Sequence, residues 1–223
     1  MSGRDEAMDT VMAYFRREKD KKLFLFRQQN RYIRPGQLLF TGSSLMEQFH
    51  VTEYCATAGV PLVAYNRGIG GYTTDEFLAG VDAMLLDVKP SKVFINIGTN
   101  DIRPMEDGGD WLERLVKNYR TILEIAREKL PETETVMLAY YPVNRSHPMM
   151  RENPGFSIRT NENVGRANAA VKALAEEFGH LFLDVSAGIR DEAGNLKLER
   201  TVDGVHMDAE AYRAVFEALR PYL

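Results

Sequence analysis

Residues that could carry out acyl transfer occur at four separate places along the chain. Ser44 offers a hydroxyl directly after an apolar run, and Asp203 and His206 lie three residues apart near the C-terminus. A serine hydroxyl is a weak nucleophile until a base takes its proton, and a histidine held by a carboxylate can be that base. A backbone N–H group in the glycine-rich stretch 66–71 and the Asn100 amide could stabilise a developing oxyanion. Together these residue types indicate acyl-serine chemistry.

Hydrophobic periodicity predicts the elements that must position these residues. Five short runs are almost continuously apolar, which is typical of strands covered on both faces in a parallel sheet. Stretches of helical periodicity alternate with them, as in repeated βαβ units. The predicted strands are 37–42, 60–66, 92–98, 135–141 and 180–186, and the main predicted helices are 73–88, 111–130, 162–178 and 208–219. The predicted fold is an α/β fold, a three-layer α/β/α sandwich with a central five-stranded parallel sheet.

Such a fold would bring the four places together. Ligands of parallel α/β sheets bind outside the carboxyl ends of the strands. Ser44 follows the first predicted strand, Gly71 the second and Asn100 the third, whereas Asp203 and His206 come after the fifth. We therefore expect the hydroxyl, the glycine-rich backbone, the carboxamide and the Asp/His pair to meet at one edge of the sheet.

These positions resemble the motif blocks of the SGNH, or GDSL-type, hydrolase family, in order from about residue 40 to residue 206. Residues 42–44 read Gly-Ser-Ser where the family usually has Gly-Asp-Ser, and residues 66–71 end in the glycine that matches an oxyanion donor. Residues 98–101 read Gly-Thr-Asn-Asp, and residues 203–206 read Asp-Gly-Val-His. Each motif is common by chance, but four blocks in order form a specific signal.

The resemblance implies a flavodoxin-like fold and a serine esterase that needs neither a cofactor nor a metal. It implies that Ser44, Asp203 and His206 are catalytic, and that Ser44, Gly71 and Asn100 form the oxyanion hole. The platelet-activating-factor acetylhydrolase-like and carbohydrate-esterase-like branches look most similar. The expected reaction is therefore removal of a short acyl group, such as acetyl, from a sugar or a lipid-like alcohol, and the expected partner is a small-molecule ester.

Residues beside the motifs are candidates for substrate contact, namely Tyr72, Asp101, Asn144 and Arg145. Two of them lie in residues 142–160, the longest irregular stretch, which we expect to form a wall or lid of the pocket because long loops are often functional. The arginines of this stretch, Arg145, Arg151 and Arg159, could favour an anionic or sugar-bearing substrate. Ser43 and Tyr72 depart from the family pattern, which often has Asp at both positions.

Length and composition limit the other possibilities. The 223 residues predict one domain over 1–223, with 4–32 as a helical extension packed on it. A net charge of −4 argues against a nucleic-acid partner. No apolar run approaches the roughly 18 residues of a membrane span, and no apolar signal segment is visible, so the expected location is the cytoplasm. The single cysteine, Cys55, excludes an intrachain disulfide. A homo-oligomer is possible.

Several alternatives stay open on the sequence alone. Ser44 could simply cap the helix after it. The acyl pocket could be longer, as in a lysophospholipase or thioesterase. A carbohydrate- or nucleotide-binding module without catalysis is a further possibility, although residues 68–71 lack the third glycine that the dinucleotide-binding motif has. His50, His147 and His180 lack the spacing of a metal site, and we expect them to be structural or solvated.

Overall fold

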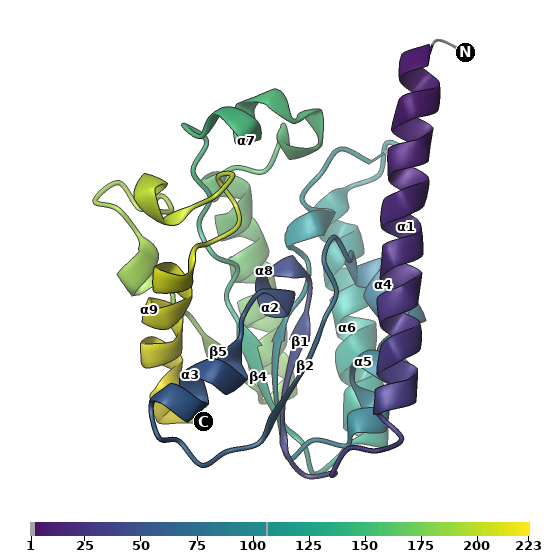
Figure 1. The fold of residues 1–223 in the computed structure, drawn as a ribbon, viewed down its shortest axis with the longest axis vertical. Helices are drawn as coiled ribbons and strands as arrows, with labels where there is room; N and C mark the ends of the chain where they lie inside the picture. The colour runs from purple at the N-terminus through teal and green to yellow at the C-terminus, as the bar shows by residue number, and fades with distance from the viewer. Residues whose placement is uncertain (1–2, 106) are drawn as a thin grey trace.

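The centre of the molecule is a five-stranded parallel sheet (Figure 1). The computed structural model describes residues 3–105 and 107–223, with side chains from residue 9 onward. The strands, in the spatial order β2-β1-β3-β4-β5, are β1 Leu38–Gly42, β2 Ala64–Gly68, β3 Lys92–Asn96, β4 Glu134–Leu138 and β5 Leu181–Leu183. This order confirms the predicted parallel sheet and its flavodoxin-like topology. The chain leaves β1 toward β2 on one side and later returns to β3 on the other, so the carboxyl end of β1 is the topological switch point, the place where sheets of this kind generally bind ligands.

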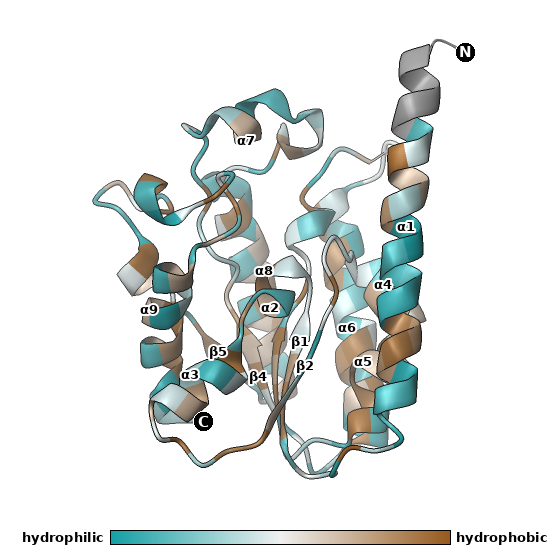
Figure 2. Cartoon of the chain, viewed as in Figure 1, coloured by the Kyte–Doolittle hydropathy of each residue, from teal (hydrophilic) through white to brown (hydrophobic). Residues whose placement is uncertain are grey.

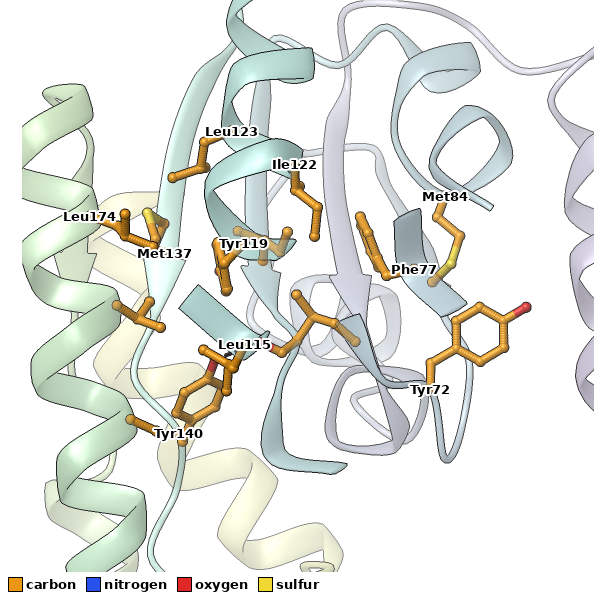
Figure 3. Close-up of a cluster of buried hydrophobic side chains, with 14 of the residues drawn as sticks. Tyr72, Phe77, Met84, Leu115, Tyr119, Ile122, Leu123, Met137, Tyr140 and Leu174 are labelled. Atoms are coloured by element: carbon orange, nitrogen blue, oxygen red, sulfur yellow. Dashed lines mark hydrogen bonds between the residues drawn. The ribbon is translucent and has the colours of Figure 1, made fainter. Parts of the chain in front are cut away.

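Helices cover both faces of the sheet, as predicted for a three-layer sandwich. On one face lie α3 Val51–Thr57 and α9 Ala209–Leu219, and on the other lie α4 Thr74–Ala79, α5 Val81–Met84, α6 Trp111–Lys129 and α8 Asn161–Phe178. Alternate residues of β1 supply opposite cores: Leu38 and Phe40 join α3 and α9, whereas Leu39 joins the other layer. This double burial explains why the predicted strands are continuously apolar. Figure 3 shows part of the second core, where side chains of α4, α5, α6 and α8 meet.

Side-chain caps fix where the helices on this scaffold begin. Thr73 and Glu76 form a capping box at the start of α4, with the Thr73 N–H donating to the Glu76 carboxylate at 2.9 Å. Asp110, Thr160 and Asp208 accept N–H groups at the starts of α6, α8 and α9. α8 ends at Gly179, which has a φ of +71°, as the sequence predicted.

Some predicted boundaries are wrong for identifiable reasons. The second strand begins at Ala64 rather than residue 60, because its ladder starts opposite Leu38, the first residue of β1. The predicted helix 73–88 is divided at Gly80 into α4, α5 and a 3₁₀ turn, Leu86–Val88. The helix expected after Ser44 is likewise divided, into α2 Ser44–Glu47 and α3, and His50 is the residue that precedes α3 rather than a residue within a helix. Residues 142–160 contain α7 Pro148–Glu152 and a 3₁₀ turn, so they are less irregular than predicted.

The N-terminal segment is one helix, α1 Gly3–Gln29, which runs along the side of the α4–α5 layer and extends beyond the sheet (Figure 1). Leu23 and Phe26 pack on the core beneath it. Figure 2 shows that hydrophobic residues of α1 gather in the part that lies beside α5, between hydrophilic turns. Arg27 forms an exposed ion pair with Asp82 of α5, and the Asn30 amide donates to the Ala83 carbonyl at 2.8 Å. Within the described residues, no helix is both long and apolar enough to cross a membrane.

Candidate active site

The hydroxyl of Ser44 is presented by a tight turn between β1 and α2. β1 ends at Gly42, whose φ is +148°, and a Cβ atom there would lie 1.9 Å from the carbonyl oxygen of Asn96. Only glycine therefore allows the chain to turn this close to β3. The residue that precedes α2 is Ser43, so Ser44 is the first residue of the helix. The side chain of Ser44 therefore does not cap the helix, which excludes the alternative that Ser44 serves only as a cap.

Ser44, His206 and Asp203 form a continuous hydrogen-bonded relay. His206 Nε2 lies 2.8 Å from Ser44 Oγ, and His206 Nδ1 lies 2.6 Å from Asp203 Oδ2. A carboxylate can only accept a hydrogen bond, so the ring carries its proton on Nδ1 and turns the lone pair of Nε2 toward the serine hydroxyl. This is the arrangement in which an imidazole can take the serine proton.

The Asp203 carboxylate is built to stay ionised. Burial alone would raise its pKa, but hydrogen bonds from the His206 ring and from two backbone N–H groups outweigh burial and lower the pKa to about 2. Those N–H groups belong to Val205 and His206 and donate to Asp203 Oδ1 at 2.9 and 2.8 Å. The turn thereby fixes one carboxylate oxygen and leaves the other for the imidazole.

Groups that could stabilise an oxyanion lie on both sides of Ser44. β1 is hydrogen-bonded to β2 on one side and to β3 on the other, so the Gly71 loop and Asn100 flank the nucleophile. In the described part of the chain, no acceptor is hydrogen-bonded to the N–H of Ser44 or to that of Gly71. Gly71 has a φ of +75°, a conformation that favours glycine. The three expected donors are thus close together in the fold.

The Asn100 amide is held at both ends. Its Nδ2 donates to the carbonyl oxygen of Tyr72 at 3.0 Å, and its Oδ1 accepts from Arg159 Nη2 at 3.4 Å. Arg159 is only 4% exposed and stacks on Phe156. Burial lowers its pKa to about 10, although attraction to Asp101 and Asp203 opposes the shift. The guanidinium is therefore a buried cation that contacts Asn100.

The four candidate substrate residues have other contacts. Asp101 accepts from the N–H of Thr74 at 3.0 Å, and burial raises its pKa to about 6 despite the bonds from Thr74. The Asn144 amide donates to the Leu196 carbonyl at 2.7 Å and accepts the Ser146 N–H at 3.0 Å. Asp101 and Asn144 therefore have structural partners, and their contact with substrate stays a prediction. Tyr72 is 4% exposed, and its backbone oxygen is the group that meets Asn100.

Arg145 makes hydrogen bonds to the backbone of its own segment, residues 142–160. Its Nη1 donates to the carbonyl oxygens of Phe156 and Ser157 at 3.2 and 2.9 Å. The N–H of Asn144 donates to the Gly204 carbonyl at 2.8 Å, which ties the segment to the turn that carries Asp203 and His206. The segment thus borders the site, and Arg159, rather than Arg145, is the arginine beside Asn100.

Two residues that the sequence analysis did not single out contact residues 69–73, the loop between β2 and α4, which we call the glycine loop. Lys19 Nζ donates to the Gly71 carbonyl at 2.9 Å, and Glu47 Oε2 accepts the Gly70 N–H at 2.7 Å. Lys19 belongs to α1, 52 residues away from Gly71 along the chain. A lysine on a charged helix gives no sequence signal of such a contact, because it is typical of a solvated face.

The remaining reactive side chains lie apart from this arrangement. Cys55 is buried, and burial raises the pKa of its thiol, which disfavours a nucleophilic thiolate. His50 faces Glu53 at the surface, and burial lowers the pKa of His180. Among the described residues, no three His, Cys, Asp or Glu side chains come together as a metal site requires.

Comparison with known proteins identifies the family. A model of the GDSL-like lipase/acylhydrolase family matches residues 42–214, a stretch that runs from the turn before Ser44 past His206. The chain belongs to this family. As a GDSL-type acylhydrolase or esterase, it is a hydrolase, which makes a non-catalytic binding module unnecessary as an explanation of the site.

Individual relatives agree with that assignment. The bovine (Bos taurus) platelet-activating factor acetylhydrolase IB subunit alpha1 is 28% identical over 189 residues, which cover 84% of this chain and 75% of that protein. A Streptococcus pneumonia protein provisionally named a platelet activating factor has a solved structure with a TM-score of 0.86 and 30% identity, and the match covers 98% of each chain. A catalytic mutant of a Geobacillus stearothermophilus acetylxylan esterase shares the fold, with a TM-score of 0.64, 19% identity and coverage of 84% of this chain and 94% of that one.

Proposed function

We propose that this GDSL-type hydrolase is a serine esterase that removes a short acyl group, such as acetyl, from a sugar or lipid-like alcohol through an acyl-Ser44 intermediate. The observation that carries the proposal is the relay from Ser44 Oγ through His206 to Asp203, with distances of 2.8 and 2.6 Å. Hydrogen bonds of this length from nucleophile to base and from base to carboxylate are what acyl transfer requires.

The reaction follows from the positions of these groups. Ser44 Oγ attacks the ester carbonyl while its proton moves to His206 Nε2, and Asp203 stabilises the imidazolium that results. The carbonyl oxygen becomes an oxyanion beside the N–H groups of Ser44 and Gly71 and the Asn100 amide. When the intermediate collapses, the carbon–oxygen bond to the alcohol breaks and the imidazolium protonates the departing oxygen. Water, deprotonated by His206, then releases the acid and restores Ser44.

The acyl group is inferred from the relatives. One is named as an acetylhydrolase, and another structure that shares the fold is an acetylxylan esterase. These two names differ in the alcohol and share the acetyl group, so acetyl is the best-supported choice for this chain. We assign the alcohol only to a broad class, sugar or lipid-like, because the names of the two relatives indicate different alcohols.

A longer acyl or alkyl group has one specific observation in its favour. A cavity of about 350 Å³ lies between α1 and the glycine loop, and Gly71 is part of its lining. Met12 and Phe15, each 56% exposed, also line it. These two exposed apolar side chains could hold part of a hydrocarbon chain, as a lysophospholipase or thioesterase would need. Charged residues line most of the rest of the cavity, namely Arg16, Lys19, Asp75, Glu76 and Arg103, which is why the short acyl group is preferred.

Hydrolysis of p-nitrophenyl acetate, butyrate and octanoate distinguishes the two candidates. The proposal predicts the highest kcat/KM on acetate, whereas a maximum on octanoate would favour the longer-acyl enzyme. Ser44→Ala should lower kcat by at least about 10³-fold, because nucleophile and base act as a unit. Ser43→Ala is the matched control: Ser43 Oγ is buried with no hydrogen-bond partner in the described structure, so its loss should change kcat less than about threefold. Equal rates for wild type and Ser44→Ala would overturn the serine mechanism.

A further inference from the structure

We propose that Lys19 of α1 is a positioning residue for the oxyanion hole, so that the N-terminal helix takes part in catalysis as well as covering the core. The inference rests on the proposed function, because it concerns the Gly71 N–H as an oxyanion donor. It goes beyond that proposal by assigning a role to an element outside the family match, which begins at residue 42.

Lys19 makes three contacts, two with the glycine loop and one with Glu76 of α4. Its Nζ donates to the Gly71 carbonyl at 2.9 Å and to Glu76 Oε1 at 2.7 Å, and it lies 5.5 Å from the ring centroid of Tyr72. The side chain is 22% exposed, which is low for a lysine on the outer helix of a protein. Ordering a lysine costs side-chain entropy, so three convergent contacts, two with the glycine loop and one with the start of α4, indicate a defined position.

Glu47 holds the other side of the same loop. Its Oε2 accepts the Gly70 N–H at 2.7 Å, and its other oxygen pairs with Lys22 of α1. Lys19 and Lys22 are three residues apart and therefore lie on one face of the helix. That face thus reaches the glycine loop twice, directly through Lys19 and indirectly through Lys22 and Glu47.

The two contacts bracket the peptide that carries the expected donor. The Gly71 N–H lies in the peptide that joins Gly70 to Gly71. The Gly70 N–H belongs to the preceding peptide, from Ile69 to Gly70, and the Gly71 carbonyl belongs to the following one, from Gly71 to Tyr72. The peptide between them contains the Gly71 N–H, which has no acceptor among the described residues. The Tyr72 N–H donates to the Ile69 carbonyl at 3.2 Å and already limits the conformations of the two consecutive glycines. Holding the peptides on both sides from Glu47 and Lys19 restricts the direction of the Gly71 N–H further. A donor that is already oriented needs no reorganisation when the oxyanion forms.

Simple attachment of α1 to the protein does not require Lys19. Leu23 and Phe26 pack on the core, and Arg27 pairs with Asp82 in the last turn of the helix. Arg27 thus provides a matched comparison, because it is a cation on the same helix with an ion pair to the body and no contact with residues 70–71. If Lys19 only anchored α1, removing either cation would have the same effect.

The test compares Lys19→Met, Lys19→Arg and Arg27→Met with wild type in the full chain. Two quantities are measured: the steady-state constants on p-nitrophenyl acetate, and the inhibition constant of phenylboronic acid, which forms a tetrahedral adduct on the serine. Losing a whole oxyanion donor lowers kcat by about 10²–10³-fold, so a donor that is only loosened should cost about tenfold. We expect Lys19→Met to lower kcat about tenfold with KM nearly unchanged and to raise the inhibition constant by a similar factor. Lys19→Arg should recover most of both, and Arg27→Met should match wild type.

The inhibition constant separates positioning from partial unfolding, because it does not depend on how much of the sample is active. Equal values of kcat and of the inhibition constant in Lys19→Met and Arg27→Met would overturn the role of Lys19. Ser44→Ala is measured alongside: if it abolishes hydrolysis while Lys19→Met does nothing, the esterase proposal stands and the positioning proposal fails. Hydrolysis that survives Ser44→Ala would overturn both.

Discussion

The Nδ2 atom of Asn100 donates a hydrogen bond to the carbonyl oxygen of Tyr72 at 3.0 Å. Asn100 follows β3, and Tyr72 follows β2 and comes directly after Gly71. The bond therefore joins the two loops that flank Ser44, from Asn100, an expected oxyanion donor, to the residue that follows Gly71, another expected donor. Each of these two donors depends on the position of the other.

This connection predicts the effect of removing the Asn100 amide. Asn100→Ala should lower kcat on p-nitrophenyl acetate by about 10²–10³-fold, or roughly 2.7–4 kcal/mol of transition-state stabilisation, because it removes one donor and releases another. KM should change little, since the interaction forms mainly in the transition state. The control is Asn153→Ala, which removes an amide of the same kind from an exposed turn. A rise in KM with kcat preserved would show that Asn100 binds substrate instead.

The Asp203 carboxylate should be essential for the state of the imidazole. Asp203→Asn can turn an N–H₂ group toward His206 Nδ1, which would place the ring proton on Nε2 and remove the base that faces Ser44. We expect kcat to fall by about 10³–10⁴-fold with the fold preserved. Asp184→Asn, which alters an aspartate that accepts the Ser186 N–H in the turn after β5 and has no hydrogen bond to the Ser44, His206 and Asp203 side chains in the described structure, should stay within a few-fold of wild type. If the two variants had similar activities, Asp203 would have no special role.

The contribution of Asp101 to the free energy of unfolding should decrease as the pH rises. A carboxylate whose pKa is lowered by folding has the opposite effect. Burial raises its pKa from 3.8 to about 6, so the folded state binds the proton more tightly than the unfolded state does. The contribution of Asp101 to the free energy of unfolding should therefore decrease as the pH rises from about 4 to about 6, by up to about 3 kcal/mol, and then level off. Urea denaturation of wild type and Asp101→Asn at several pH values measures this. The difference between the two curves should change over that interval, and a constant difference would contradict the raised pKa.

Arg159 should influence the rate through Asn100. Arg159→Met removes a buried cation whose Nη2 lies 3.4 Å from Asn100 Oδ1, and a cation at that oxygen makes the amide a better donor. We expect kcat to fall about tenfold, less than for loss of the amide itself. Arg151→Met, in the same segment but exposed, is the control and should change nothing. The ratio of rates on neutral and anionic esters should stay constant in Arg159→Met. A selective loss on anionic esters would make Arg159 a substrate-binding residue.

The parts of the site that could be predicted are those that depend on local sequence. Ser44 follows a run that had to be a buried strand, and the three-residue spacing of Asp203 and His206 allows a carboxylate to reach the ring across one turn. The order of the strands then places these groups at one edge of the sheet. The fold class could be predicted for the same reason, because the hydrophobic pattern of each strand reports burial on both faces.

The remaining features depend on contacts between distant segments. The sequence placed Arg145, Arg151 and Arg159 in one loop, but only packing on Phe156 shows which of them lies beside Asn100. Asp101 belongs to a family motif, so it suggested substrate contact, whereas its carboxylate bonds Thr74 at the start of α4. Lys19 lies on a helix whose charge pattern is typical of solvent exposure. The contacts of Arg159, Asp101 and Lys19 could not be predicted, because each joins segments that are far apart in the sequence.

The most direct test of the account is covalent labelling of the nucleophile. A fluorophosphonate reacts with a serine only when a base activates it, and its phosphoryl oxygen then occupies the oxyanion hole. Wild-type protein should take up one label per chain, peptide mass mapping should place it on Ser44, and hydrolysis of p-nitrophenyl acetate should disappear in proportion to labelling. Uptake at another residue, or full hydrolysis after Ser44 has been labelled, would contradict the account.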